Sequence, residues 1–150
     1  MKDKWSLSQA EVEKILAEAE VGVLATLSPD GPYAVPVNYV YHQGRIYFHG
    51  GFQGQKMEFI ARDPRVSFVV YETVAYRRGQ TPCSVSTVYR SVVISGQARL
   101  IQGQAAEVAL RRLVAKFAPA LADQPIPPEK LARTAVVEIE VTRLTGKFRD

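Results

Sequence analysis

The residues best suited to chemistry lie between Arg45 and Lys56, in the run RIYFHGGFQGQK. A predicted strand ends at His49, three glycines then leave the backbone open, and Lys56 stands at the start of a predicted helix. Free amide groups at a helix start, with a cation beside them, can hold an anion such as phosphate. The run is equally typical of a flexible turn with a surface lysine, and it contains neither the P-loop nor the dinucleotide glycine pattern.

His49 has several possible roles. An imidazole at a strand end can hydrogen-bond a phosphate, exchange a proton near neutral pH, or simply cap the strand. The chain has two histidines, and His42 falls in a predicted turn, so no zinc site built from several histidines is expected. A single histidine can still ligate a haem iron, and that alternative stays open.

Two further side chains could carry chemistry. Arg90, followed by Ser91 at the start of a predicted strand, can hold a phosphate or carboxylate through two N–H groups. It can equally be a solvated arginine. Cys83 is the one cysteine, in a polar stretch near Arg77 and Arg78. A lone cysteine usually has no role in catalysis. The positions of the two histidines indicate no serine or cysteine catalytic triad.

The elements that must position these residues follow from periodicity. Ser8 and Glu11 have capping-box spacing, and an apolar stripe predicts a helix over 8–20. A short helix is predicted after Gly54, and a second amphipathic helix over 105–117. Alternating apolar residues predict six strands, at 21–27, 32–41, 45–49, 65–76, 87–101 and 135–141.

The order of the strands predicts the fold class. Tight turns join the first three strands, which indicates an antiparallel meander and disfavours a parallel nucleotide-binding fold. Pro36 places an edge or a bulge in the second strand, and Gly96 a bulge or a tight bend in the fifth. Residues 77–86 are predicted to form an exposed loop. We therefore expect a mainly β fold, a small closed or nearly closed barrel with flanking helices, in one domain over 1–150.

Composition excludes several classes of protein. The chain has 150 residues, of which 47% are hydrophobic and 23% charged, which is ordinary for one globular domain. No apolar run is long enough to span a membrane, and the N-terminus lacks a secretory signal, so a soluble cytoplasmic protein is expected. The net charge of +4 is scattered. It gives little support to nucleic-acid binding but suits a phosphorylated small ligand.

Several segments, in order, resemble a known family. They are GVLATLSPDGPYAVPVNYVY, GRIYFHG, GQKME, DPRVSFVV and YRSVVISGQARL, followed by EIEVTRLTGK near the C-terminus. From about Gly22 onward the chain is similar to the FMN-binding split-barrel superfamily. Its nitroimidazole-resistance (Nim) branch, related to pyridoxamine 5'-phosphate oxidase, is the most similar.

This resemblance implies a six-stranded antiparallel split barrel that works as a homodimer, with two FMN sites at the subunit interface. The second strand would lay its backbone along the isoalloxazine ring. The turn after the next strand would hold the phosphate side, and a later strand would complete the pocket. In this chain those positions are Pro36, Val37, Asn38 and Tyr39 for the ring, His49, Gly50 and Lys56 for the phosphate side, and Arg90 and Ser91 for completion.

The implied function is an FMN-dependent oxidoreductase acting on a small molecule, such as a nitroreductase, with His49 in the active site. The chain lacks the arginine-rich phosphate strand and the C-terminal substrate segment of pyridoxamine 5'-phosphate oxidase itself. Residues 80–87 also lack a tryptophan expected in many Nim relatives. Both departures bear on the substrate more than on the flavin. The alternative is a non-catalytic module that holds FMN, haem or a deazaflavin for storage or sensing.

Overall fold

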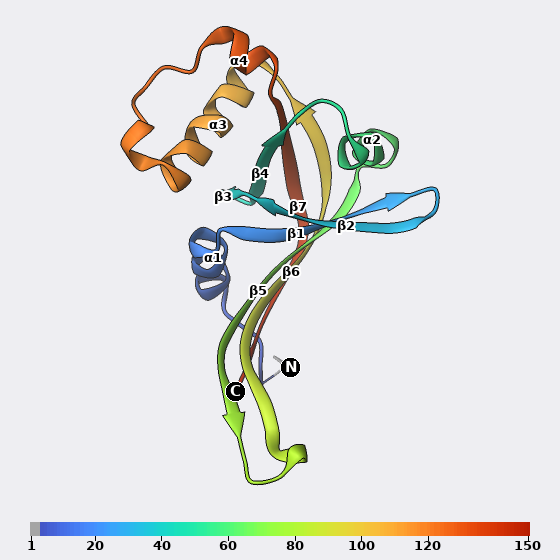
Figure 1. Cartoon of the computed structure of the whole chain (residues 1–150), viewed down its shortest axis with the longest axis vertical. Helices are drawn as coiled ribbons and strands as arrows, with labels where there is room; N and C mark the ends of the chain where they lie inside the picture. Colours follow the sequence, from blue (N-terminus) through green and yellow to red (C-terminus); the bar gives the residue numbers. More distant parts are fainter. Residues whose placement is uncertain (1–3) are drawn as a thin grey trace.

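A computed structural model describes residues 4–150, and within them seven strands form one antiparallel sheet (Figure 1). The strands are β1 Val21–Ser28, β2 Gly31–Asn38, β3 Val40–His42, β4 Arg45–Gly50, β5 Arg65–Arg78, β6 Val85–Ile101 and β7 Ala135–Arg149. Their order across the sheet is β2-β1-β5-β6-β7-β4-β3. The helices are α1 Gln9–Glu18, α2 Gln55–Arg62, α3 Gly103–Phe117 and α4 Pro128–Ala132, with short 3-10 turns at Pro82–Ser84 and Pro119–Leu121.

The two end strands of this order are neighbours in the sequence, because Tyr39 alone separates β2 from β3. Asn38 pairs with Val21 of β1, whereas Val40 pairs with Tyr47 of β4. The chain therefore crosses from one edge of the sheet to the other within one residue. This brings the two edges together and gives the split barrel that the sequence predicted.

The prediction of one strand over 32–41, and with it the simple meander, is wrong. The strand divides at Tyr39, so the structure has seven strands where six were expected. The physical reason is the burial of the Tyr39 side chain, whose ring meets Phe68 edge-on at 5.0 Å between centroids. Its hydroxyl donates a 2.7 Å hydrogen bond to the carbonyl of Leu16 in α1.

Two other expectations about the strands are confirmed. Pro36 lies in β2, an end strand of the order, where the missing N–H costs no ladder bond on the open side. At Gly96 the register between β6 and β7 shifts, which is a bulge. A Cβ at Gly96 would stand 2.5 Å from the carbonyl oxygen of Glu140, so the close approach of these backbones requires glycine.

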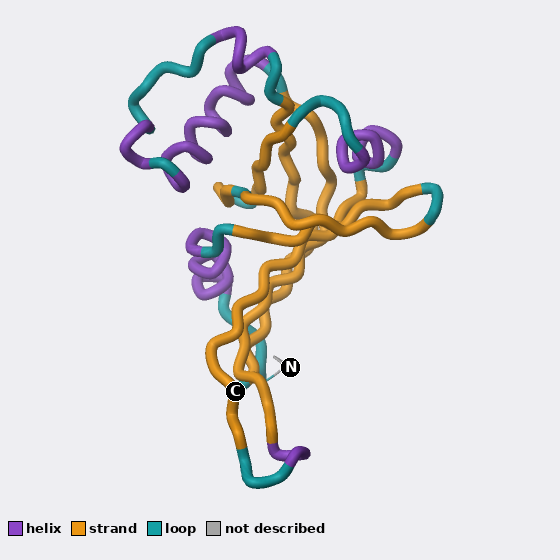
Figure 2. Tube along the Cα trace, in the orientation of Figure 1, coloured by secondary structure: helices purple, strands orange, loops and turns teal. Residues whose placement is uncertain are grey.

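The predicted exposed loop over 77–86 is much shorter in the structure. Arg78 still pairs with Val85, so β5 and β6 continue as a hairpin that projects from the barrel (Figure 2). β7 lies beside it and reaches Arg149, well past the predicted end at 141. We call residues 71–89 of this hairpin the arm. Its side chains are mostly exposed on both faces, so the alternation of burial that reveals a strand is absent there.

The main core fills the barrel and the space under α1. Its largest fully buried side chains include Leu24, Ile46, Phe48, Phe68, Ile94 and Ile139. The predicted capping box of α1 is confirmed: Ser8 Oγ accepts from the amide of Glu11 at 3.3 Å, and Glu11 Oε2 accepts from the amide of Ser8 at 2.8 Å. A second, smaller cluster joins α3 to Val136 of β7. No helix within residues 4–150 combines the length and apolar character needed to cross a bilayer.

Candidate functional site

Two of the predicted site residues, Asn38 and His49, line the same pocket of about 350 Å³. They come from β2, one end strand of the sheet, and from β4, the strand next to the other end, and the crossing at Tyr39 brings these two strands together. The other wall is α3 and the residue after it, with Leu110, Leu113, Val114, Phe117 and Ala118. The pocket is therefore largely apolar, with one exposed imidazole and one amide side chain on its sheet side.

The four predicted residues of the second strand divide between two faces. Pro36 and Asn38 are exposed, and Asn38 Nδ2 donates to the carbonyl of Glu20 at 3.2 Å. Val37 is partly buried against the main core, and the Tyr39 side chain is fully buried in it. Only Pro36 and Asn38 can thus present side chains outside the barrel, while Val37 and Tyr39 can offer a ligand only backbone groups.

Gly50 and Lys56 lie close together, as the anion-site prediction requires. Gly50 ends β4, and a Cβ built there would stand 3.7 Å from Lys56 Nζ. Gly54, at φ 124°, precedes α2 and supplies no side-chain cap. The first amides of the helix, at residues 55–57, have no acceptor within the helix. A cation therefore lies beside Gly50 at the end of β4, one residue after His49, and the same lysine lies in the first turn of α2, whose first amides lack helical acceptors.

Arg90 and Ser91 lie elsewhere in the same chain. On β7, His49 pairs with Val136 but Arg90 pairs with Phe148, a separation of about 40 Å along an extended strand. Arg90 forms a 2.9 Å ion pair with Glu72 at the base of the arm, and its Nε is buried without a hydrogen-bond partner among the described residues. One chain alone does not bring these two residues to His49.

Lys116 is a residue near the pocket that sequence reasoning missed. Its Nζ donates to the carbonyl of Ala19 and, at 3.0 Å, to that of Tyr39, and it lies 4.2 Å from the centre of the Tyr39 ring. Burial lowers the pKa of Lys116, and nearby Glu20 partly opposes this. These contacts hold the C-terminal end of α3 against Ala19 and Tyr39, beside the pocket. The available signal was a lysine in the last turn of a helix, where it can bond carbonyl groups.

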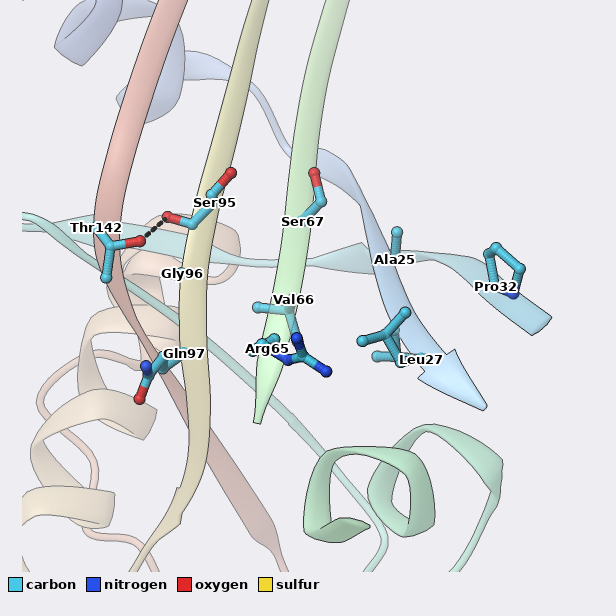
Figure 3. Close-up of a pocket in the computed structure, with 11 residues that line it drawn as sticks. Ala25, Leu27, Pro32, Arg65, Val66, Ser67, Ser95, Gly96, Gln97 and Thr142 are labelled. Atoms are coloured by element: carbon cyan, nitrogen blue, oxygen red, sulfur yellow. Dashed lines mark hydrogen bonds between the residues drawn. The ribbon is translucent and has the colours of Figure 1, made fainter. Parts of the chain in front are cut away.

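A different pocket, of about 490 Å³, lies on the outside of the sheet over β1, β2, β5 and β6 (Figure 3). Its walls include Ala25, Leu27 and Pro32 on one side and Ser67 and Gly96 on the other. Thr142 Oγ1 donates to the carbonyl of Ser95 at 3.0 Å beside it. None of the predicted site residues lines this pocket. Within residues 4–150, no group of three or more His, Cys, Asp or Glu side chains could hold a metal ion.

The family model described as pyridoxamine 5'-phosphate oxidase matches residues 8–148, almost the whole barrel and its helices. The chain belongs to the pyridoxamine 5'-phosphate oxidase family. It is also 28% identical over 91 residues to the uncharacterized protein RA0666 of Rhizobium meliloti (strain 1021). That match covers 61% of this chain and 53% of the relative, so the chain spans about half the length of the curated relative.

Solved structures agree on the fold. A candidate 5-nitroimidazole antibiotic resistance protein from Bacteroides thetaiotaomicron VPI-5482 has a TM-score of 0.79 at 23% identity, covering 99% of this chain and 85% of that one. The FAD and haem binding protein of Mycobacterium smegmatis has a TM-score of 0.90 at 18% identity, covering 99% and 74%. The predicted split barrel and the predicted family are therefore confirmed for this member of the pyridoxamine 5'-phosphate oxidase family.

Proposed function

We propose that this protein binds a flavin and uses it, as an FMN-dependent oxidoreductase, to reduce a small molecule such as a nitroaromatic compound. The observation that carries this proposal is that His49, which lines the apolar pocket, and Gly50, which lies beside Lys56, are consecutive residues at the end of β4. Similar structures support it, since one is described as an FAD and haem binding protein and another as a nitroimidazole resistance protein.

The Gly50–Lys56 site suits the phosphate of FMN. A phosphate dianion would gain a charge-assisted contact from Lys56 Nζ and hydrogen bonds from the first amides of α2. The side-chain-free backbone at Gly50 lets a ligand approach closely. The donors at this site are a cation and amide N–H groups, which match an anion and no cationic ligand.

The Asn38–His49 pocket suits the flat ring system. Its wall of α3, with Leu110, Leu113 and Phe117, is apolar, so binding there would remove the apolar faces of the ring from water, which is favourable. When bound, FMN would carry the electrons between a donor and the substrate. This chain would orient the ring, keep water from it, and hold a proton on the exposed imidazole of His49 for delivery to the substrate.

A second copy of the chain would complete the site. The outer face of β1 and β6 exposes Val21, Val23, Leu27 and Val93 between 41% and 49%, an apolar surface of the kind that covers itself in a dimer. Arg90 and Ser91 would then enter the flavin site from the partner copy, because one chain keeps them far from its own His49.

A storage or sensing module for haem or a deazaflavin is the second candidate. One exposed imidazole in an otherwise apolar pocket is what an axial haem ligand needs, and His49 meets that description. Such a module would bind its cofactor tightly but show no turnover with a reduced nicotinamide donor.

The test is the visible absorption spectrum of the purified protein, before and after addition of FMN and desalting, with FAD and haem in parallel. Flavin bands that stay with the protein, and turnover of a nitroaromatic with reduced nicotinamide, are the expected results. A retained Soret band without turnover would favour the second candidate. Retention of none of these cofactors would overturn the proposal.

A matched pair of lysine variants tests the anchor. We expect Lys56→Gln to weaken FMN binding about tenfold or more, since a charge-assisted contact to phosphate is lost. Lys14→Gln is the control, because Lys14 is an exposed lysine of α1 that pairs only with Glu18 across one helical turn. Equal FMN affinity in both variants would remove Lys56 from the site.

A further inference from the structure

A second group of charged side chains lies on the outer face of the sheet, under the other flank of α3. Tyr47 of β4, Glu138 of β7 and Arg99 of β6 stand directly across from one another in the strand register. Glu138 is only 7% exposed. A carboxylate this deeply buried requires cationic partners.

The Glu138 carboxylate has those partners. Arg99 donates to Glu138 Oε1 through Nε at 3.1 Å and Nη2 at 2.9 Å, and Arg45 Nε lies 3.8 Å from the same oxygen. Glu140, the other acid on this face of β7, is exposed and lies opposite Arg45 in the register. The negative charge of Glu138 is thus compensated before any ligand arrives.

Arg112 of α3 faces this row with no partner of its own. Gln104, Val108 and Arg112 follow one another at intervals of four residues, so they share one flank of the helix. Arg112 makes no hydrogen bond or ion pair to any residue of 4–150, whereas the adjacent Arg111 pairs with Glu107 at 3.0 Å. Burial, then Glu138, raise the pKa of Tyr47, and Arg112 is close enough to oppose them.

The space between this flank and the row is a pocket of about 370 Å³. Ala105, Val108 and Ala109 give it an apolar wall. Its polar groups are Arg112, Gln104, Tyr47 and the Glu138 carboxylate, whose charge Arg99 and Arg45 compensate. It lies on the opposite flank of α3 from the Asn38–His49 pocket, which Leu110, Val114 and Phe117 line. The two pockets are therefore separate and lie on different sides of the helix.

We propose that this pocket is a binding site for a small organic anion, with Arg112 binding its carboxylate or phosphate group. The apolar wall takes the body of the ligand, and the Gln104 amide donates a further hydrogen bond to the anionic group. The Arg45–Glu138–Arg99 group holds Tyr47 in place as the floor. The site needs no flavin, so it stands or falls separately from the proposed function.

The experiment is calorimetric titration of the purified protein with benzoate, phenyl phosphate and, as the neutral probe, benzyl alcohol. We expect saturable binding of at least one anion and none of benzyl alcohol. The preferred anion tells a carboxylate site from a phosphate site. Binding of neither anion, or of benzyl alcohol as tightly as the anions, would overturn the proposal.

Three variants locate the site. Arg112→Gln should weaken anion binding about tenfold or more, because it removes a charge-assisted hydrogen bond. Arg112→Lys should keep binding within a few fold, which also shows that position 112 tolerates change. Arg111 is the neighbouring arginine on another flank of the helix, so the Arg111→Gln variant should bind the anion as tightly as the protein without substitutions. Equal losses in the 111 and 112 variants would mean general attraction of anions and no site.

Discussion

His49 is the residue on which the proposed chemistry depends most directly. If its imidazole delivers a proton, His49→Ala should lower turnover about 100-fold or more while leaving flavin binding unchanged. Flavin retention by desalting and steady-state rates measure the two properties separately. Loss of flavin would make His49 an anchor, and an unchanged rate with retained flavin would contradict both roles. His42→Ala is the matched control, since it removes the other histidine of the chain, which does not line this pocket.

Tyr39 makes a prediction about stability and pH. Burial raises the pKa of Tyr39 far above its ordinary value of about 10. As pH rises past 10, the unfolded chain releases this proton and the folded protein keeps it, so folding stability falls. At pH 8, Tyr39→Phe should cost about 1 kcal/mol through the lost hydrogen bond to Leu16. That cost should shrink above pH 10.

Urea unfolding at pH 8 and pH 10.5 measures this change. Tyr76→Phe is the control, since Tyr76 is 59% exposed on the arm and its replacement should change stability little at either pH. A cost of Tyr39→Phe that stays constant with pH would show that the folded protein ionises this tyrosine as readily as the unfolded chain.

At the residue scale, sequence reasoning found the groups that a local pattern marks. The glycines around His49 and the lysine at the helix start predict an anion site within twelve residues of chain. Lys116 and Arg112 carry no such mark. Each becomes notable only because α3 packs against strands that precede it by more than 50 residues, which no local pattern reveals.

Among the elements, the bulge of β6 places a strict steric limit on its sequence. A methyl group at Gly96 would stand 2.5 Å from the backbone oxygen of Glu140 and 2.8 Å from Ile139 Cγ2. We expect Gly96→Ala to destabilise the protein by about 1–3 kcal/mol, as overpacking does. Chemical denaturation measures it. Gly51→Ala is the control, because its Cβ would meet no atom closer than 4.0 Å. Equal effects of the two changes would contradict the steric explanation.

Prediction of the elements succeeded where one face of each element is buried. The helix at Ser8 and the strands at Val21 and Arg45 begin as expected, because caps and alternation mark them. Prediction failed at Tyr39. The alternation of apolar residues continues through this position, although the chain passes there from one edge of the sheet to the other. Prediction also failed along the arm, where exposure on both faces removes the period.

For the whole molecule, the arm makes the predicted homodimer testable. Tyr71 and Tyr76 are 57% and 59% exposed on it, and the Tyr71 ring stacks on Tyr89 at 5.6 Å. If the arm contacts a second copy, replacing both Tyr71 and Tyr76 by serine should convert the dimer to a monomer. Light scattering after gel filtration measures this change. Leu121→Ser is the control, because Leu121 is an apolar residue beyond α3 that is 50% exposed. If the protein without substitutions is already a monomer, the prediction of a homodimer is wrong.

The single residue between β2 and β3 also determines where this chain tolerates inserted residues. One residue inserted beside Tyr39 would reverse the alternation of side chains downstream, so that Val40 and Tyr41 would exchange faces. Asn38 and His49 would then no longer meet across a common pocket. The six residues that connect β5 to β6 at the far end of the arm carry no such restriction. Lengthening that connection costs only a little loop entropy, so new loops can be added there and not at the crossing.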